Sequence, residues 1–408
     1  MSTSARAEGV GLTASTVLWL VACLSMLQPL ATDLYLPALP GIARHFNADV
    51  ATVQSTLSIF VAGFGLWQLV AGPLSDRFGR APVILCGVAT YCAASVLCML
   101  APTIDVLIAG RLLQAIGACS CLVGARGVVR DLLSPSEGAR LLAAGATIMA
   151  VAPLLGPLIG AHLFIAFGWR SAFAALTFAS LMLLAFTGLR LRETNLRLDR
   201  DALAPGPMLR TYARVARSPT FRAYTLAAST SYAGLFAFLS GSSFVLIGTY
   251  GMSGTAFGLS FALMVSGYMI GTIFCRRLLA RVGVRHTIAV GACVQVFAGT
   301  TMAALALAGQ HVPAAIIAPM FFYGISHGIV QPPVQSGAVA PFANSAGAAA
   351  ALMGFTMMLI ASLVGFLIGT THDGTVYPLA LAIWAASIAT FVLAFTLVRR
   401  HGDVSQYR

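Results

Sequence analysis

Lysine is absent from this sequence and acidic residues are scarce, so the chain lacks the mixed charge of a soluble protein. All 24 basic residues are arginine, only 12 residues are acidic, and charged residues make up 9% of the 408 positions. In soluble domains the charged share is roughly a quarter. With 59% hydrophobic residues and a mean hydropathy of +0.89, the composition predicts an integral membrane protein.

Motifs for nucleotide, metal or covalent chemistry are also missing. The sequence has no Walker-type phosphate loop, no zinc-ligand spacing and no Ser/His/Asp arrangement. Its 8 cysteines lie in apolar runs, where a thiol behaves as a small hydrophobe. Cys119 and Cys121 are two residues apart and therefore face different sides of a helix. We expect no enzyme activity, no metal, no cofactor and no ATP-driven pumping.

The apolar runs are long enough to cross a membrane and are separated by polar loops. A helix of about 20 apolar residues spans a bilayer. The first run, residues 16–36, is too long for a cleavable signal sequence. Twelve membrane-spanning helices are predicted, near residues 16–36, 52–72, 82–100, 104–125, 141–164, 171–189, 223–247, 254–276, 287–307, 312–330, 346–369 and 375–398.

Arginine is unevenly distributed among the loops, and this predicts the orientation. On this helix assignment nearly all loop arginines fall on one face of the membrane, and only Arg44 and Arg170 fall on the other. Cytoplasmic loops are enriched in basic residues, so both termini are expected in the cytoplasm. The net charge of +12 could suggest nucleic acid as a partner, but a nucleic-acid patch would not alternate with helix pairs in this way.

Two related halves are predicted. Arg77 and Gly79 precede Arg281 and Gly283 by half the chain length, which indicates a parallel repeat of two six-helix bundles. The predicted parts are a first bundle at residues 1–189, a cytoplasmic linker at 190–222 and a second bundle at 223–408. The arginines of the linker either bind anionic lipid headgroups or only fix the orientation.

A polar stretch, GPLSDRFGR at residues 72–80, separates the second and third apolar runs. We expect a tight loop here, with Gly72 and Pro73 ending the second helix, because proline cannot donate into the last helical turn. The stretch resembles the loop between helices 2 and 3 of the major facilitator superfamily. The residues that match the pattern of that loop are Gly72, Leu74, Ser75, Asp76, Arg77, Gly79 and Arg80.

The resemblance implies a role for this loop in conformational switching. In related transporters such a loop is thought to latch the two halves together on the cytoplasmic side. Asn344 and Ser345 could cap the eleventh helix, whose positive end would then be available to Asp76. Arg126 and Arg130, at the inner end of the fourth helix, are further predicted partners of Asp76. The alternative is a loop that only marks topology.

Two charges fall well inside predicted helices, Asp33 in the first and Arg111 in the fourth, whereas Asp105 and Arg276 lie at helix ends. A charge inside the membrane costs at least about 2.5 kcal/mol on insertion scales, so such residues are usually functional. Counted from the flanking prolines, the depths of both residues allow them to meet. One hypothesis is that Asp33 takes up and releases a coupling proton. The alternative is an inert pair that fixes helix packing.

Three segments resemble the Bcr/CflA branch of drug:proton antiporters, and the similarity extends over the whole chain. They are ATDLYLPALP from residue 31, LIAGRLLQAIGA from residue 107 and APLLGPLIG from residue 152. In that family the aspartate of helix 1 and the arginine of helix 4 are implicated in proton and drug handling, which carries over to Asp33 and Arg111. Gly156, Pro157 and Gly160 match the antiporter motif of helix 5.

The helix-5 segment departs from the family pattern at two positions, where Ala152 and Ala161 replace glycine. Its remaining glycines permit close helix packing, and Pro153 and Pro157 kink the helix by removing backbone hydrogen bonds. A kinked and closely packed helix could seal the protein against proton leak. Ordinary helix packing is the alternative.

Aromatic residues and one amide are candidates for the lining of a drug pocket. They are Tyr35, Tyr232, Phe236, Tyr268 and Gln114. Aromatic residues in membrane spans also serve packing and interface anchoring, and that alternative stays open. His327 in the tenth helix is interpreted as a hydrogen-bonded core residue.

These features predict a monomeric secondary transporter of the bacterial inner membrane that exports small, mainly apolar drugs or toxic compounds in exchange for protons. Its partners would be the small-molecule substrate, protons and membrane lipid. A proton-coupled exporter of a natural metabolite, such as an amino-acid derivative, is the alternative in the same class. A non-transporting receptor or scaffold would not need Asp33 and Arg111.

Overall fold

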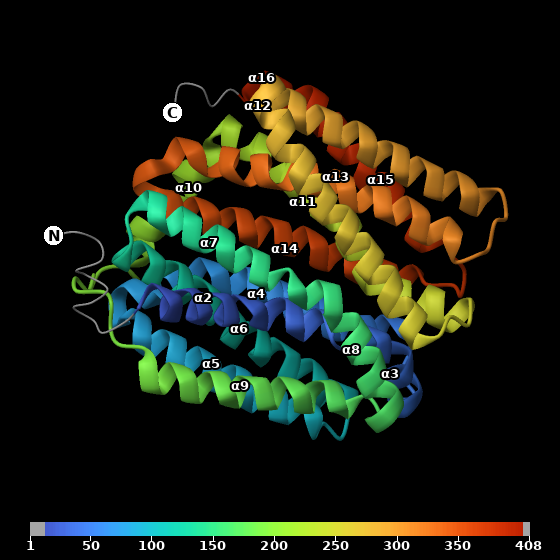
Figure 1. Ribbon diagram of the computed structural model, residues 1–408, viewed down its shortest axis with the longest axis horizontal. Coiled ribbons are helices and arrows are strands. Elements are labelled where there is room, and N and C mark those ends of the chain that lie inside the picture. Colours follow the sequence, from blue (N-terminus) through green and yellow to red (C-terminus); the bar gives the residue numbers. More distant parts are fainter. Residues whose placement is uncertain (1–12, 403–408) are drawn as a thin grey trace.

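The computed structural model describes residues 13–402, and every regular element in that range is a helix (Figure 1). The predicted positions of the two chain ends concern residues 1–12 and 403–408, which lie outside this range. The first elements are α2 (Ala14–Asp33), η1 (Leu36–Ala38), α3 (Leu39–Phe46), α4 (Val50–Phe78), α5 (Arg80–Met99), α6 (Ile104–Leu132), α7 (Pro135–Met149), α8 (Val151–Phe167), α9 (Arg170–Arg190) and α10 (Pro205–Arg217). The others are α11 (Pro219–Ser243), η2 (Phe244–Thr249), α12 (Gly254–Leu307), α13 (Ala314–Val339), η3 (Ala340–Ser345), α14 (Ala346–Thr371), α15 (Tyr377–Leu393), η4 (Ala394–Val398) and α16 (Arg399–His401).

Ten helical segments in the described range are long and apolar enough to cross a membrane. Two of them far exceed one crossing, which takes about 20 residues, since Gly254–Leu307 has 54 residues and Ala314–Thr371 has 58. The backbone leaves the helical region at Gly283 in the first and at Phe342 in the second. In Figure 1, α12 accordingly runs as a hairpin. The prediction of an all-helical membrane protein is confirmed, and with each long segment divided in two the described helices account for the twelve predicted spans.

Helix α4 does not end where the sequence predicted. It continues through Gly72 and Pro73 to Phe78, so the helix end expected at these two residues is wrong. The turn is a single residue, Gly79, whose φ of 100° and ψ of 161° suit glycine alone. Gly283, half the chain length later, has a φ of 74° and a ψ of 179°. The same unusual backbone conformation at corresponding positions supports the internal repeat.

Prolines begin helices at three places outside the predicted membrane spans. Pro37 and Pro40 lie in the first turns of η1 and α3 rather than in an outer loop. Pro205 is the first residue of α10, inside the predicted linker. Proline suits the first turn of a helix, because its missing N–H would have no partner there and its φ is already helical. The sequence interpretation therefore overlooked the helix in the linker.

The two halves pack against each other mainly through two helix pairs. Helix α4 lies along α14, where Ser362 Oγ donates a hydrogen bond to the carbonyl of Ser58 at 2.9 Å. Helix α8 lies against the start of α12, so closely that a Cβ on Gly258 would be 2.7 Å from Leu158 Cα. One hydrophobic cluster contains buried residues of both halves. The bundles therefore share a core at their interface.

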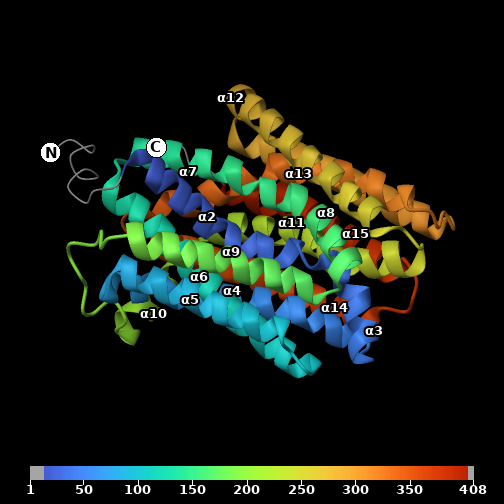
Figure 2. The ribbon, with the colours of Figure 1, turned by 60° about the horizontal axis from the view of Figure 1, so that its bottom comes forward.

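The halves meet differently at the two ends of the molecule. We call the end that holds Gly79 and α10 the loop end, and α3 lies at the opposite end (Figure 1, Figure 2). Near the opposite end the halves are in contact, and Gln54 Nε2 donates to the carbonyl of Ser240 at 3.1 Å. At the loop end they enclose a cavity of about 680 Å³. The halves are therefore in direct contact near one end and are separated by a cavity at the other.

Candidate functional site

Asp33 and Arg111 are both buried, with 4% and 0% of their surface exposed. Asp33 is the last residue of α2, and its carboxylate accepts a hydrogen bond from Thr32 Oγ1 at 2.9 Å. Arg111 Nη1 donates to the carbonyl of Ala31 at 2.9 Å and to Gln114 Oε1 at 2.5 Å. No ion pair joins Asp33 to Arg111 in the described structure. The arginine holds the end of α2 through a backbone carbonyl, so the direct pairing considered from the sequence does not form.

An aromatic cage surrounds the guanidinium of Arg111. Its Cζ atom lies 4.3 Å from the ring centre of Phe60, 4.8 Å from that of Tyr35 and 6.0 Å from that of Phe173. Cation–π contacts of this kind stabilise a guanidinium that has lost its water. Nη2 of Arg111 has no hydrogen-bond partner among the described residues. Tyr35 thus belongs to the surroundings of Arg111, and the sequence interpretation missed Phe60 and Phe173.

Hydrogen bonds join this group to α4 and α5. Arg111 Nε donates a hydrogen bond to the backbone carbonyl of Thr56 in α4 at 3.4 Å. The hydroxyl groups of Thr56 and Tyr35 share a further hydrogen bond. Gln114 Nε2 donates to Ser95 Oγ in α5 at 2.8 Å. Three of the predicted residues, Tyr35, Arg111 and Gln114, therefore form one polar and aromatic cluster inside the first half.

The other predicted aromatic residues gather in the second half around His327. The ring of Tyr232 is stacked on that of Phe236, with centroids 6.3 Å apart. His327 lies between Tyr232 and Tyr268, at centroid distances of 6.2 and 5.8 Å. Its Nδ1 shares a hydrogen bond with Ser231 Oγ at 3.0 Å. This contact supports the interpretation of His327 as a hydrogen-bonded core residue, and the sequence did not show that it is where the aromatic residues meet.

Gln331 is a polar group that the sequence interpretation missed. It follows His327 by one helical turn on α13 and is only 5% exposed. Its Nε2 lies 3.2 Å from Met357 Sδ, and its Oε1 has no hydrogen-bond partner in the described range. An unpaired buried amide costs free energy, about 1–3 kcal/mol. An amide in an otherwise apolar run was the signal in the sequence that marks this position.

Helix α8 packs directly on the end of α2. A Cβ on Gly156 would lie 3.1 Å from Asp33 Cβ, and a Cβ on Gly160 would overlap the backbone of Leu34. Pro157 lies inside α8 and Pro153 near its start. The two glycines of the helix-5 segment therefore make room for the part of α2 that carries Asp33.

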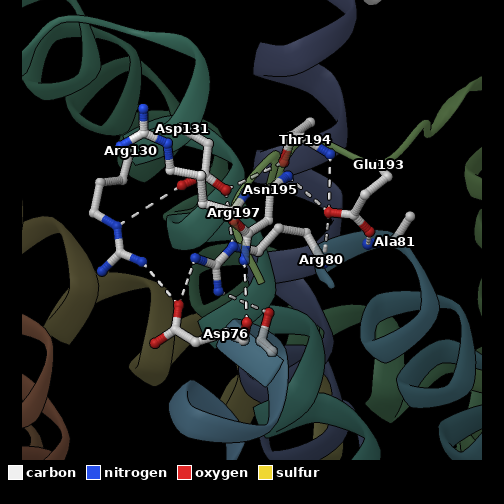
Figure 3. Close-up of polar contacts among 10 residues, drawn as sticks. Asp76, Arg80, Ala81, Arg130, Asp131, Glu193, Thr194, Asn195 and Arg197 are labelled. Atoms are coloured by element: carbon white, nitrogen blue, oxygen red, sulfur yellow. Dashed lines mark hydrogen bonds and ion pairs between the residues drawn. The ribbon is translucent and has the colours of Figure 1, made fainter. Parts of the chain in front are cut away.

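At the loop end, Asp76 and its neighbours form a network of charged groups (Figure 3). Asp76 Oδ1 accepts hydrogen bonds from Arg80 Nη2 at 2.6 Å and from Arg130 Nη2 at 3.1 Å. Arg80 also donates from Nε to Asp131 Oδ2 at 2.9 Å. Arg77 lies outside this network, with its guanidinium 5.4 Å from the ring centre of Phe78. The loop thus joins the end of α4 to the end of α6 within the first half.

Glu193, which follows α9, is another residue that the sequence interpretation missed. Its carboxylate accepts hydrogen bonds from the backbone N–H groups of Arg80 at 2.9 Å and Ala81 at 3.1 Å (Figure 3). These N–H groups begin α5 and have no partner within the helix, and the positive helix end favours a negative charge. Asn195 Nδ2 donates to the backbone carbonyl of Asp76 at 3.2 Å. The predicted linker is thereby anchored on the loop.

The predicted contact between Asp76 and the start of α14 is not formed here. Asp76, Asn344 and Ser345 line the same cavity, but no hydrogen bond joins Asp76 to either residue in the part of the chain that the structure describes. Arg126 lines the cavity as well and makes no ion pair with a described residue. Of the two arginines expected to bind Asp76, Arg130 does so and Arg126 does not.

Comparison with known proteins agrees with these features. Residues 21–366 match the family described as the Major Facilitator Superfamily. The chain belongs to the Major Facilitator Superfamily. The match includes Asp33, Arg111 and the whole stretch 72–80. The structure of a D-xylose-proton symporter is similar in fold, with a TM-score of 0.73 and 15% identity, and the similarity covers 97% of this chain and 100% of that one.

Two full-length relatives of this major facilitator protein are named for drug resistance. A bicyclomycin resistance protein homolog of Haemophilus influenzae is 26% identical, over 93% of this chain and 95% of the relative. A chloramphenicol resistance protein of Pseudomonas aeruginosa is 29% identical, over 95% of this chain and 91% of the relative. The resemblance to the Bcr/CflA branch is thereby supported by distant relatives along the whole chain.

As a major facilitator protein the chain is a multi-pass membrane transporter of small molecules and not an enzyme. Transport by this fold requires the two halves to open at alternate ends. The cavity at the loop end and the contacts near the opposite end correspond to one of these two states.

Proposed function

We propose that this transporter exports small, mainly apolar drugs or toxic compounds across the bacterial inner membrane in exchange for protons. The main observation in support of this proposal is the position of Asp33. It is the only buried acidic residue in the described range, and it lies inside the span Ser15–Phe46. A proton-driven exporter needs a buried group that binds a proton in one facing state and releases it in the other, and an acidic residue inside a membrane span is the expected group.

Both halves contribute to the surroundings of Asp33. Helix α11 of the second half lies against η1, which begins three residues after Asp33. Gly156 of α8 packs on its Cβ, and Arg111 fixes the end of α2 through Ala31. Movement of residues 223–408 relative to residues 1–189, joined by the linker 190–222, would change the polarity around the carboxylate. Proton binding at Asp33 would in this way depend on which end of the transporter is open.

The loop end is assigned to the cytoplasm because the arginine-rich loops lie there. With this orientation the cavity of about 680 Å³ faces the cytoplasm, and a substrate from inside the cell enters through it. The close packing of α8 on α2 then lies between the cavity and the opposite end. It supports a role for Gly156 and Gly160 in preventing proton leak.

Vesicle transport tests this function. Chloramphenicol and bicyclomycin, chosen from the names of the relatives, are offered to inverted membrane vesicles under an imposed proton gradient. Asp33→Asn keeps the shape of the side chain but cannot titrate, so the variant should insert normally and lose gradient-driven uptake. Asp105→Asn is the matched control, because Asp105 is an exposed acid at the start of α6.

Two results would contradict the proposal. Uptake by Asp33→Asn at the wild-type rate would remove Asp33 as the coupling residue. Failure of the wild-type protein to take up either compound would argue against drug export and favour a natural metabolite as substrate. Expression and membrane insertion are measured for every variant, so that loss of protein is not mistaken for loss of coupling.

A further inference from the structure

Pro73 leaves a backbone acceptor in α4 without its usual donor. In an α-helix each carbonyl accepts a hydrogen bond from the N–H four residues later. Four residues after Leu69 stands Pro73, which lies inside α4 and has no N–H. The carbonyl of Leu69 is therefore open to a donor from outside the helix.

Tyr212 is that donor. Its hydroxyl donates a hydrogen bond to the carbonyl of Leu69 at 2.8 Å. Tyr212 lies on α10, 143 residues further along the chain. Burial raises the pKa of the Tyr212 phenol, so it keeps the proton that it donates at neutral pH. A side chain of the linker thus replaces the helical hydrogen bond that Pro73 removes.

Helix α10 lies at the loop end of the molecule (Figure 2). Pro207, Met208, Thr211 and Tyr212 line the cavity together with residues of α4 and α14. Ser218 alone separates α10 from α11, the first helix of the second half. A contact that holds α10 on α4 therefore also restrains the second half relative to the first.

We propose that Tyr212 is a positioning residue for the transport cycle, which acts through Leu69 to hold α10 on α4 and limits access to the cavity. The inference rests on the proposed function, since the cavity is taken as the route of substrate entry. Pro73 makes the contact specific, because it exposes one carbonyl at one place on α4. The position that corresponds to Pro73 in the second half is Arg277. Arginine has a backbone N–H, so the second half has no proline at this place to free a helical carbonyl.

A reporter cysteine in the cavity measures the contact without any substrate. Ala350→Cys places a thiol on the cavity lining, and a membrane-impermeant maleimide is added to inverted vesicles. The adduct is measured at residue 350 by mass spectrometry, because the chain has 8 other cysteines. Tyr212→Phe in this background removes only the hydroxyl. Labelling should become about fivefold faster, the factor expected for one hydrogen bond of ordinary net strength.

Hydrogen exchange and a matched tyrosine control complete this measurement. Amide exchange of residues 205–217 should rise by a similar factor in Tyr212→Phe. Tyr250→Phe should change neither readout, because the Tyr250 hydroxyl has no hydrogen-bond partner in the described structure. Unchanged labelling and unchanged exchange in Tyr212→Phe would overturn the role of Tyr212.

Pro73→Ala separates this mechanism from general stabilisation by a tyrosine. The alanine returns an N–H four residues after Leu69, which competes for the same carbonyl. In the Pro73→Ala background, Tyr212→Phe should raise the labelling rate by less than half as much as it does when Pro73 is present. An equal effect with Pro73 and with alanine would overturn the role of the proline. Because neither readout needs a transported compound, failure here is distinct from failure of drug export.

Discussion

The loop at Gly79 and its counterpart at Gly283 share a backbone turn but differ in what surrounds them. Both glycines have a positive φ and connect two long helices. At the first loop Asp76 binds two arginines, whereas Ala280 stands at the corresponding place in the second. The repeat thus preserves the conformation of the turn and not its charged contacts.

The packing around the two glycines differs as well. A Cβ on Gly79 would strike the carboxylate of Glu193, whereas a Cβ on Gly283 would have no atom from a distant part of the described chain within 4 Å. The first loop is therefore covered by the linker and the second is open. A turn of the same geometry is therefore a simple connection in the second half and an attachment point for the linker in the first.

The largest effect is expected when the acidic charge of the first loop is removed, because the second loop has no acid at this position. Asp76→Asn removes the charge that holds Arg80 and Arg130. Hydrogen bonds to charged groups contribute about 1.5–3 kcal/mol, and the exposure of Asp76 reduces this. We expect uptake in vesicles to fall roughly tenfold, the factor that about 1.4 kcal/mol produces, while the protein inserts normally. Normal turnover by this variant would show that Asp76 only marks topology.

A smaller effect is expected on stability, and it should differ between substitution of Gly79 and substitution of Gly283. Alanine in this glycine-only region costs about 1–3 kcal/mol, so both Gly79→Ala and Gly283→Ala should lower the unfolding temperature in detergent. Gly79→Ala should lower it more, because its methyl group also displaces Glu193 from the start of α5. If Glu193→Ala is added, the two glycine substitutions should become similar. Equal destabilisation in the wild-type background would contradict the importance of the Glu193 contact.

The smallest effect is expected when the acid is restored to the second loop. Ala280 is exposed, so Ala280→Asp should change the free energy of unfolding by less than about 0.5 kcal/mol. Vesicle uptake should stay within twofold of the wild type, because the structural partners found at the first loop are not repeated by this single change. A larger gain or loss of transport would mean that the charge alone distinguishes the two loops.

The sequence by itself determined the class of the protein and the residues that interrupt its apolar helices. Hydrophobic runs and the cost of a charge in a membrane act locally along the chain, so the spans and the buried residues Asp33 and Arg111 could be recognised without a structure. The glycine of each loop was also visible, because its position recurs after half the chain length.

Only the tertiary structure decided which partners these residues have. Arg111 binds a backbone carbonyl of α2 instead of Asp33, and Glu193 covers a helix start more than a hundred residues earlier in the chain. Helix α4 continues through Pro73, where the Leu69 carbonyl finds its donor in Tyr212. A local pattern shows that a hydrogen bond is missing, but it cannot show which distant group replaces it, because that depends on how the helices pack.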